Sequence, residues 1–258
     1  MEQKEFNLKE LTLWAEKGNL EALNKLGNYY YDLSKEDVTN EEYNNKTYYY
    51  LSKAYEKGLS EGNLSPEIAN KYANCFCFGV GTKKDDAKAF ELFKYPAFYG
   101  RMNAQENLAL SYLHGQGTEK DLDRAIYYFN LAEKQNSIKA CNWLAVIHFY
   151  KDYNREDLSL AYKFALRAKD SFPQNMAIIL GLCCESGRGT EKNTIKAKEY
   201  YKLGMKYNRP ECEYSYAVCL LNEEIFDENE EEAIRLLKSA RDKGYGPAAK
   251  KLENLGVK

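Results

Sequence analysis

The chain has 258 residues, enough for one or two ordinary domains or for one continuous array of repeats. It carries 37 Lys and Arg against 39 Asp and Glu, a net charge of -2. This balance argues against a nucleic-acid-binding protein, because phosphate contacts need clustered cations. The hydrophobic content of 44% is too high for a disordered chain.

The targeting signals of a secreted or membrane protein are missing from the sequence. The first twenty residues contain seven charged side chains and no apolar run, and the most apolar stretch, 176–184, is far shorter than the roughly 20 residues that span a bilayer. The seven cysteines are irregularly spaced, and we expect reduced thiols that pack as small apolar residues. We therefore expect a cytoplasmic protein without membrane insertion, although export without a leader would leave no such trace.

A 36-residue period organises the chain. Three Gly-x-Gly-Thr segments begin at Gly79, Gly115 and Gly187, which are one and two periods apart. Two tracks of small residues keep the same period through five copies: Ala73, Ala109, Ala145, Gly181 and Ala217, and Ala89, Ala125, Ala161, Ala197 and Ala233. Small residues let two antiparallel helices approach closely. One such pair cannot bury its own apolar face, so the pattern predicts stacked helix pairs.

In chain order, we expect a capping helix at about 5–17, six helix pairs, and a second capping helix at about 247–255. The pairs span about 20–58, 65–100, 102–136, 138–172, 174–208 and 210–244. N-cap residues open the second helix of pairs two to six: Asp85, Asp121, Asp157, Asn193 and Asn229. Residues that tolerate left-handed backbone end the second helix of every pair except pair four, where Phe172 breaks the track: Gly58, Gly100, Asn136, Asn208 and Gly244. Proline lies near the start of four first helices, at Pro66, Pro173, Pro210 and Pro247.

Several pairs depart from this frame. Pair one holds ten extra residues, which we expect in a loop at Ser34–Asn45 and at Ser60–Asn63. In place of the glycine turn, pair four has residues 151–153 and pair six has residues 223–225. Pro96 falls inside the second helix of pair two, where we expect it to kink or shorten the helix.

The best-preserved repeat identifies a family. Residues 104–125 read Ala-x-x-x-Leu-Ala-x-x-Tyr-x-x-Gly-x-Gly-Thr-x-x-Asp-x-x-x-Ala, which resembles the Sel-one-like repeat (SLR) family, relatives of tetratricopeptide repeats. The resemblance extends over roughly residues 5–256. It implies an all-α, right-handed superhelical solenoid of antiparallel helix pairs, one domain over residues 1–258, whose first helices line a concave groove.

Catalytic and metal-binding motifs are absent. The sequence has no Gly-x-Ser-x-Gly, His-Glu-x-x-His, P-loop or Ser-x-x-Lys motif. Of its two histidines, His114 lies beside a turn with no Cys or Ser positioned to pair with it, and His148 takes a position that fills the space between helices. Cys75-x-Cys77 lacks the spacing of a zinc half-site. We therefore expect a protein that is not an enzyme and needs no cofactor or metal.

The resemblance also places the candidate partner-binding residues. We expect the positions three before and one after each small residue of the first helix to face the groove, with the position two before at its edge. The N-terminal third of the groove then offers Asn24, Lys25, Asn28, Asn70, Lys71 and Asn74. Asn and Lys suit a peptide backbone or a terminal carboxylate, similar in residue type to the carboxylate clamps of some tetratricopeptide domains.

Beyond the N-terminal third of the groove, the same positions are apolar or aromatic: Leu110, Trp143, Val146, Ile178, Leu182, Tyr214 and Val218. These are either partner contacts, foremost Trp143 and Tyr214, or ordinary core between repeats.

Together these features predict a scaffold that binds a protein or peptide in its groove. One alternative is an inhibitor or immunity-type protein that blocks a single enzyme, through its convex face or through its tyrosines. Many of the 23 tyrosines stand in runs, and neighbouring rings in a helix diverge by about 100°, so some must be exposed. The other alternative, a small-molecule binder or hydrolase, is disfavoured by the missing motifs.

Overall fold

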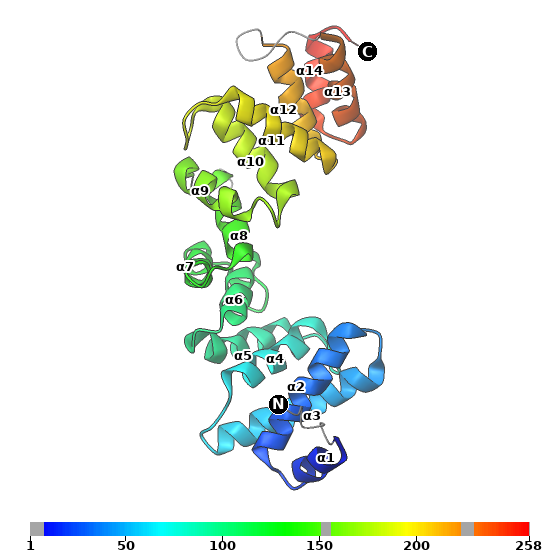
Figure 1. Ribbon diagram of the computed structural model, residues 1–258, viewed down its shortest axis with the longest axis vertical. Coiled ribbons are helices and arrows are strands. Elements are labelled where there is room, and N and C mark those ends of the chain that lie inside the picture. Colours follow the sequence, from blue (N-terminus) through cyan, green and yellow to red (C-terminus); the bar gives the residue numbers. More distant parts are fainter. Residues whose placement is uncertain (1–7, 151–155, 223–229, 258) are drawn as a thin grey trace, which may run out of the picture. The chain divides into compact units, whose positions relative to one another are not determined.

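The computed structural model describes residues 8–150, 156–222 and 230–257, and throughout these ranges the regular elements are α-helices (Figure 1). The chain divides after Gln135 into two compact units. The expected fold class, an all-α array of antiparallel helix pairs, is confirmed.

Unit 1 contains the single helix α1, followed by three helix pairs: α2 with α3, α4 with α5 and α6 with α7. Its helices are α1 (Leu8–Glu16), α2 (Leu20–Glu36), α3 (Glu41–Ser60), α4 (Pro66–Phe78), α5 (Asp86–Phe98), α6 (Met102–His114) and α7 (Leu122–Glu133).

Unit 2 also contains three helix pairs, α8 with α9, α10 with α11 and α12 with α13, followed by one helix that packs on α13. Its helices are α8 (Ile138–Phe149), α9 (Leu158–Ala168), α10 (Pro173–Ser186), α11 (Thr194–Lys206), α12 (Pro210–Leu220), α13 (Glu230–Asp242) and α14 (Gly246–Asn254). From α4 onward, the first helices and α14 begin 35 to 37 residues apart (at residues 66, 102, 138, 173, 210 and 246), in agreement with the 36-residue frame.

Both small-residue tracks are buried where the two helices of a pair meet. The members that are glycine rather than alanine face a larger side chain. A Cβ atom on Gly27 would lie 2.8 Å from Cδ2 of Leu51, and one on Gly181 would overlap the ring of Tyr201. The repeat therefore requires a small residue at this position, and the size of the side chain on the opposing helix determines whether it is alanine or glycine.

Side-chain caps start the second helices as expected. The described cap residues each accept a hydrogen bond from the backbone N–H three residues further on: Asp85, Asp121, Asp157 and Asn193. Asn229 lies outside the described residues. The turn glycines have left-handed backbone, with φ of 74° at Gly79 and 63° at Gly81, and the two later copies repeat this geometry.

Two expectations for pair one were wrong. No long loop forms at Ser34–Asn45, because α2 continues to Glu36 and Asn40 already caps α3 by accepting from the N–H of Tyr43. The inserted residues therefore lengthen the two helices. Gly58 does not end α3 either: it is buried inside the helix, where a Cβ atom would lie 3.0 Å from Cα of Leu64, and Gly62 takes the left-handed conformation instead.

Pro96 does not shorten its helix. α5 continues through Pro96 to Phe98 and has 13 residues, as α11 does. Pro96 stands in the last turn, where its missing N–H removes one backbone hydrogen bond, the one to the carbonyl of Leu92, without ending the helix. Residues 151–153 and 223–225, which replace the glycine turn in the sequence, lie outside the described residues. The helices α8 and α9 still pack as a pair.

Candidate functional site

The predicted groove residues lie on the first helices, and within each unit successive first helices contact one another. In unit 1 α2 contacts α4, and in unit 2 α10 contacts both α8 and α12. Side chains of one pair can therefore bond to those of the next.

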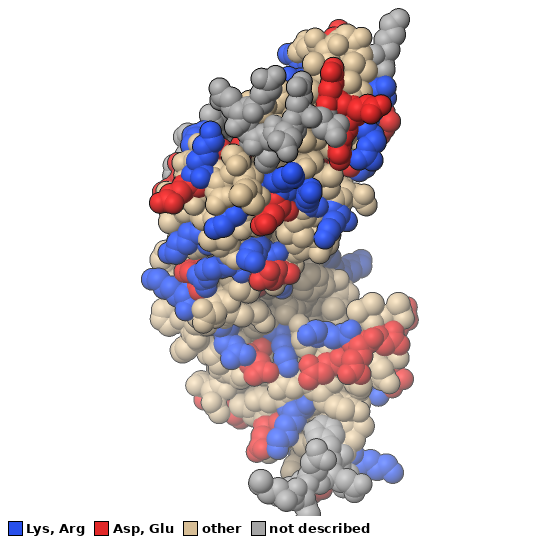
Figure 2. All heavy atoms as spheres, turned by 45° about the horizontal axis from the view of Figure 1, so that its top comes forward, with Lys and Arg blue, Asp and Glu red and all other residues tan. Residues whose placement is uncertain are grey.

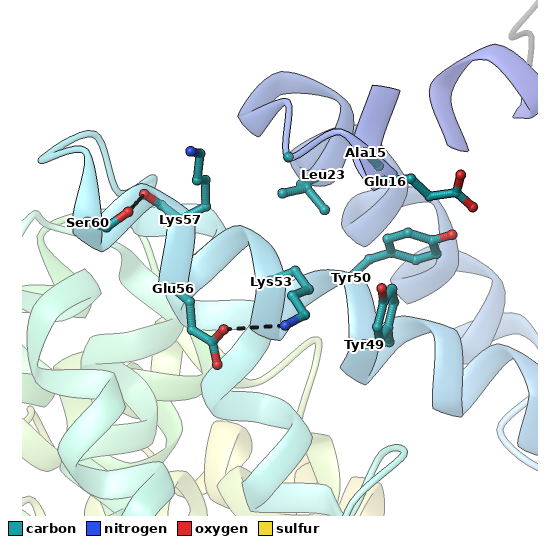
Figure 3. A pocket seen from close by; sticks show the side chains of 10 residues that line it. Ala15, Glu16, Leu23, Tyr49, Tyr50, Lys53, Glu56, Lys57 and Ser60 are labelled. Atoms are coloured by element: carbon teal, nitrogen blue, oxygen red, sulfur yellow. Dashed lines mark hydrogen bonds and ion pairs between the residues drawn. The ribbon is translucent and has the colours of Figure 1, made fainter. Parts of the chain in front are cut away.

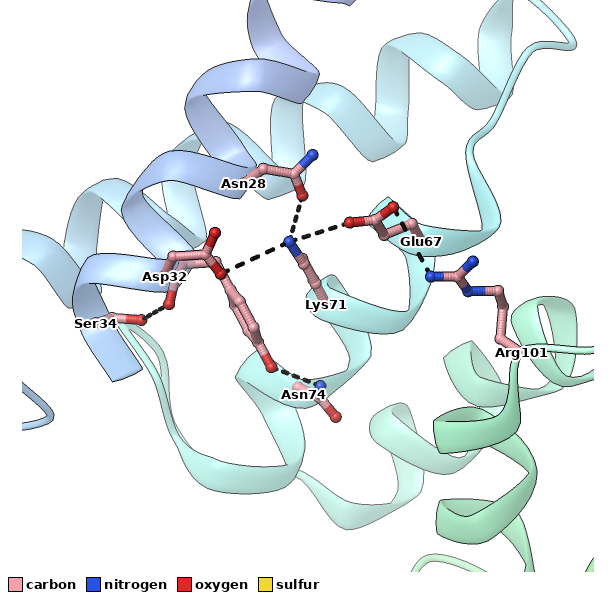
Figure 4. Close-up of polar contacts among 8 residues, drawn as sticks. Asn28, Asp32, Ser34, Glu67, Lys71, Asn74 and Arg101 are labelled. Atoms are coloured by element: carbon pink, nitrogen blue, oxygen red, sulfur yellow. Dashed lines mark hydrogen bonds and ion pairs between the residues drawn. The ribbon is translucent and has the colours of Figure 1, made fainter. Parts of the chain in front are cut away.

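Lys71 is the centre of a polar cluster between α2 and α4 (Figure 4). Its ammonium donates to Oδ1 of Asn28 at 2.6 Å, lies 3.2 Å from Glu67 and 4.0 Å from Asp32, and stands 5.1 Å from the ring centroid of Tyr31. Its side chain is only 15% exposed. The charge of Lys71 is thus compensated within the protein, in contrast to the free cation of a carboxylate clamp.

A second step of hydrogen bonds continues this cluster to α6. Nδ2 of Asn74 donates to the hydroxyl of Tyr31 at 2.8 Å, and Nδ2 of Asn107 donates to Oδ1 of Asn74 at 3.3 Å. Burial raises the pKa of Tyr31, which keeps its hydroxyl neutral. The hydrogen bonds Lys71 to Asn28 and Asn107 to Asn74 join equivalent positions of successive pairs. Each runs from the residue two before a small residue to the residue one after the preceding small residue. We call Asn28, Tyr31, Lys71, Asn74 and Asn107 the inner polar row.

The other three predicted residues of unit 1 take no part in this row. Lys25 is exposed and pairs with Glu21 of its own helix at 2.6 Å. Asn24 is half-buried and lines a pocket of about 550 Å³ beside the start of α2. Asn70 is 8% exposed, and its Oδ1 atom is buried without a hydrogen-bond partner. Of the six predicted Asn and Lys residues, Asn28, Lys71 and Asn74 are brought together.

This arrangement favours an amide ligand over an anion. The half-buried amides of Asn28 and Asn107 can pair with peptide groups, which have one donor and one acceptor each. A carboxylate would have to displace Glu67 or Asp32 from Lys71. A peptide backbone is therefore the better fit of the two ligands considered from the sequence.

Sequence reasoning missed several members of the cluster. Tyr31 and Asp32 lie one turn after Asn28, Glu67 lies one turn before Lys71, and Arg101 contacts Glu67 at 3.8 Å. The signal that could have found the first three is the helical spacing of three to four residues from a chosen position. Arg101 comes from the turn before α6, and its contact depends on tertiary structure.

Unit 2 presents mostly apolar side chains at the matching positions. Trp143, Val146, Leu182 and Val218 are half-buried, as is Tyr214, whose ring lies 5.4 Å from that of Tyr245. Ile178 is 4% exposed and belongs to the core. One hydrogen bond joins successive first helices here, from Nδ2 of Asn175 to Oδ1 of Asn142 at 3.1 Å.

The cysteine and histidine side chains, which could support catalysis, lie in environments typical of structural residues. Burial raises the pKa of Cys75 to about 12 and that of Cys212 to about 12, so both are protonated thiols at neutral pH. The imidazole of His148 stacks on Phe164 at 6.2 Å. Within the described ranges, no group of three or more His, Cys, Asp or Glu residues could hold a metal ion.

The charged side chains are mixed over the surface. Figure 2 shows acidic and basic residues interspersed on the visible face, in keeping with the net charge of -2. None of the described helices is long and apolar enough to cross a membrane.

Known proteins with similar repeats agree with this architecture. A crystal structure of c5321, a protective antigen of uropathogenic Escherichia coli with an SLR fold, matches with a TM-score of 0.66 at 16% identity, over 97% of this chain and 59% of that one. A Sel1 repeat protein from Oxalobacter formigenes matches with a TM-score of 0.58 at 22% identity, over 76% of this chain and 84% of that one. These likenesses show the fold.

Sequence comparison leads to the same family. An uncharacterized protein of Neisseria meningitidis serogroup B is 26% identical, and the alignment covers 59% of this chain but only 40% of that protein. The Sel1 repeat pattern itself matches residues 20–59, 66–95, 103–137, 176–204 and 210–245. The unmatched stretch between the third and fourth matches contains pair four, whose glycine turn is replaced. The chain belongs to the Sel1 repeat family.

Proposed function

We propose that this protein is a non-catalytic scaffold that binds a segment of a partner protein along its first helices. The observation that carries this proposal is the inner polar row, in which the position after the small residue on α2 and α4 and the position two before it on α4 and α6 present polar side chains linked from pair to pair. A row that repeats with the helix pairs suits a ligand that is itself repetitive, and a peptide backbone is such a ligand.

The row is also held in place before any ligand arrives. Lys71 has acceptors on both α2 and α4, and Asn74 bonds to side chains of α2 and α6. Because these side chains are already ordered, a bound peptide would not have to immobilise them, which reduces the entropic cost of binding. In unit 2, Trp143 and Tyr214, both half-buried, are proposed as apolar partner contacts.

The test is affinity capture from a lysate of the source organism with purified chain as bait. The bait variants are the double variant Asn28→Ala/Asn74→Ala and the single variant Trp143→Ala. The control variant is Tyr127→Ala, which changes an exposed residue of α7. We expect a specific partner to be lost with the double variant and retained with the control, all at unchanged melting temperature. Retention by every inner variant would contradict the proposal.

A second candidate function, inhibition of one enzyme through the second helices of the pairs, has its own support. The second helices expose large aromatic side chains, including Phe98 at 84% and Tyr127 at 59%. Phe98 occupies a frame position that is Lys134, Asp170, Lys206 or Asp242 in the other copies. A partner captured by the inner double variant but lost with Phe98→Ala would favour this function.

A further inference from the structure

A pocket of about 580 Å³ opens in unit 1 between α1, the start of α2 and α3 (Figure 3). It has an apolar floor and a charged rim. The lining residues that matter are Ala15, Leu23, Tyr49, Tyr50, Glu16 and Lys53. None of the inner polar row lines it, so this is a separate site.

Two tyrosine rings form one wall of the pocket. The rings of Tyr49 and Tyr50 meet edge to face, with centroids 5.1 Å apart and planes at 78°. Tyr50 is fixed from behind, because it stacks on Tyr30 at 5.4 Å with an interplanar angle of 6°. Tyr49 is 52% exposed. The wall therefore combines a fixed ring with an accessible one.

The chain contains a second copy of this ring arrangement. Tyr127 and Tyr128 of α7 meet at 5.2 Å and 78°, and Tyr128 stacks on Tyr112 at 5.9 Å and 7°. Tyr127 is 59% exposed, close to the value for Tyr49. The second copy therefore has the same rings on α7 rather than on α3.

The charges around the pocket leave one carboxylate uncompensated. Lys53 lies 3.8 Å from Glu56, and Lys57 lies 2.9 Å from Glu61. Among the described residues, Glu16 has neither a hydrogen bond nor an ion pair through its side chain. Figure 3 shows Glu16 at the same end of the pocket as the two rings, away from Lys57 and Ser60.

Cations elsewhere in the chain lie over aromatic rings. Lys46 stands 5.1 Å from the ring centroid of Tyr30, and Arg124 stands 5.4 Å from that of Tyr112. Within the described part of the chain, no cation lies over Tyr49 or Tyr50. The pocket thus holds the aromatic faces and the carboxylate that a cation needs, and none of the described cations lies over those faces or pairs with that carboxylate.

We propose that this pocket binds the side chain of a Lys or Arg residue from a partner protein. The charged end lies against Glu16 and the rings of Tyr49 and Tyr50, where the ring quadrupoles and the carboxylate attract it. The aliphatic stem packs on Ala15 and Leu23, as long cationic side chains do on apolar surface. The volume exceeds that of one side chain, which leaves room at the rim for the flanking backbone.

The experiment titrates the full chain with capped tripeptides and follows the tyrosine ring signals by NMR. The peptides are Ac-Ala-Lys-Ala-NH2, Ac-Ala-Arg-Ala-NH2 and Ac-Ala-norleucine-Ala-NH2, and cadaverine is the free amine. We expect the Lys and Arg peptides to bind with Kd values of roughly 1 mM and to shift the Tyr49 and Tyr50 signals. The norleucine peptide, which keeps the stem but lacks the charge, should bind at least about fivefold more weakly.

Matched variants locate the site. Tyr49→Ala and Glu16→Gln should each weaken the Lys peptide about three- to fivefold, whereas Tyr127→Ala, in the second ring pair, should leave its affinity unchanged. Asn74→Ala should also leave it unchanged, which separates this site from the inner polar row. Equal binding of the norleucine peptide, or equal losses for Tyr49→Ala and Tyr127→Ala, would overturn the proposal. Cadaverine binding as tightly as the Lys peptide would overturn the assignment to a protein ligand.

Discussion

The two units use one frame to build two different inner faces. In the first two pairs of unit 1, the position after the small residue of the first helix is Asn28 or Asn74, and hydrogen bonds link it to the next pair. In the third pair of unit 1, this position is Leu110. In unit 2, the same position is Val146, Leu182 or Val218, all half-buried. Both units nevertheless form three helix pairs.

The difference shows which positions the fold constrains. The small tracks lie at the contact between the two helices of a pair and stay small in both units, because a larger side chain would separate those helices. The positions after the small residues vary more: Asn74 bonds to side chains of both neighbouring first helices, whereas Val146, Leu182 and Val218 are apolar and half-buried. They can change from polar to apolar without changing the fold, which makes this face available for binding.

The largest expected effect on stability comes from exchanging the residue types of the two units at one position of the repeat. Lys71 and Ile179 both stand two residues before the small residue, but Lys71 is 15% exposed and Ile179 is fully buried. Ile179→Lys should lower the free energy of unfolding by about 4 kcal/mol or more, because it buries an ammonium group. Lys71→Ile should cost about 1–2 kcal/mol, the value of its charged hydrogen bonds. Urea denaturation measures both, and equal losses would remove the distinction between the faces.

A smaller effect is expected at the two glycines of the small track. Gly181→Ala should cost about 2–3 kcal/mol, because the new Cβ meets the fully buried ring of Tyr201. Gly27→Ala should cost about 1 kcal/mol or less, since Cδ2 of Leu51 is the flexible end of a side chain. Thermal melts of the two variants test the order, and a larger loss for Gly27→Ala would contradict it.

The buried thiols predict a loss of stability at alkaline pH. Burial raises the pKa of Cys75 and of Cys212 to about 12, whereas a thiol of the unfolded chain titrates near 8.5. The folded state keeps the proton, so its advantage is complete below pH 8.5 and declines as the pH rises toward 12. Each such thiol should lower the free energy of unfolding by about 1–2 kcal/mol between pH 8.5 and 10.

Single-thiol variants compare the units in this respect. Cys75→Ala in unit 1 and Cys212→Ala in unit 2 should each make the decline with pH shallower by this amount, and urea curves at pH 8.5 and 10 measure it. An unchanged slope for either variant would show that its thiol does not contribute.

The smallest expected effects are at two hydrogen bonds of equal spacing. Asn107 donates to Asn74 in unit 1, and Asn175 donates to Asn142 in unit 2, each 33 residues apart. Asn107→Ala and Asn175→Ala should each cost about 0.5–1 kcal/mol. Only Asn107→Ala should also weaken capture of a partner. A loss of capture by Asn175→Ala alone would place the binding face outside the inner polar row, and a loss by both variants would contradict the restriction to unit 1.

Helix positions could be predicted well from the sequence because their signals are local and repeated. Asp85, Asp121, Asp157 and Asn193 cap as expected, since an N-cap bond reaches only three residues along the chain. Pair one was harder, because its inserted residues interrupt the frame and are compatible with either a loop or longer helices. Asn40, which caps α3, decided for longer helices.

The candidate site was predictable in its residue types but not in its bonds. Asn28, Lys71 and Asn74 could be placed on one face by counting from the small track. That Glu67 and Asp32 compensate Lys71 depends on which rotamers meet across two helices, and counting does not reveal it. The exposure of Tyr49 beside Glu16 likewise depends on where α1 packs against the first pair.

The sequence by itself determined the repeat length, the family and the helix pairs, because small residues, caps and turn glycines act within a pair and recur every 36 residues. Only the tertiary structure decided which polar groups are left for a partner. That outcome depends on contacts between residues some 30 to 45 positions apart, such as Lys71 with Asn28 and Asn74 with Tyr31. The strength of such contacts depends on distance and burial, which residue identity alone does not specify.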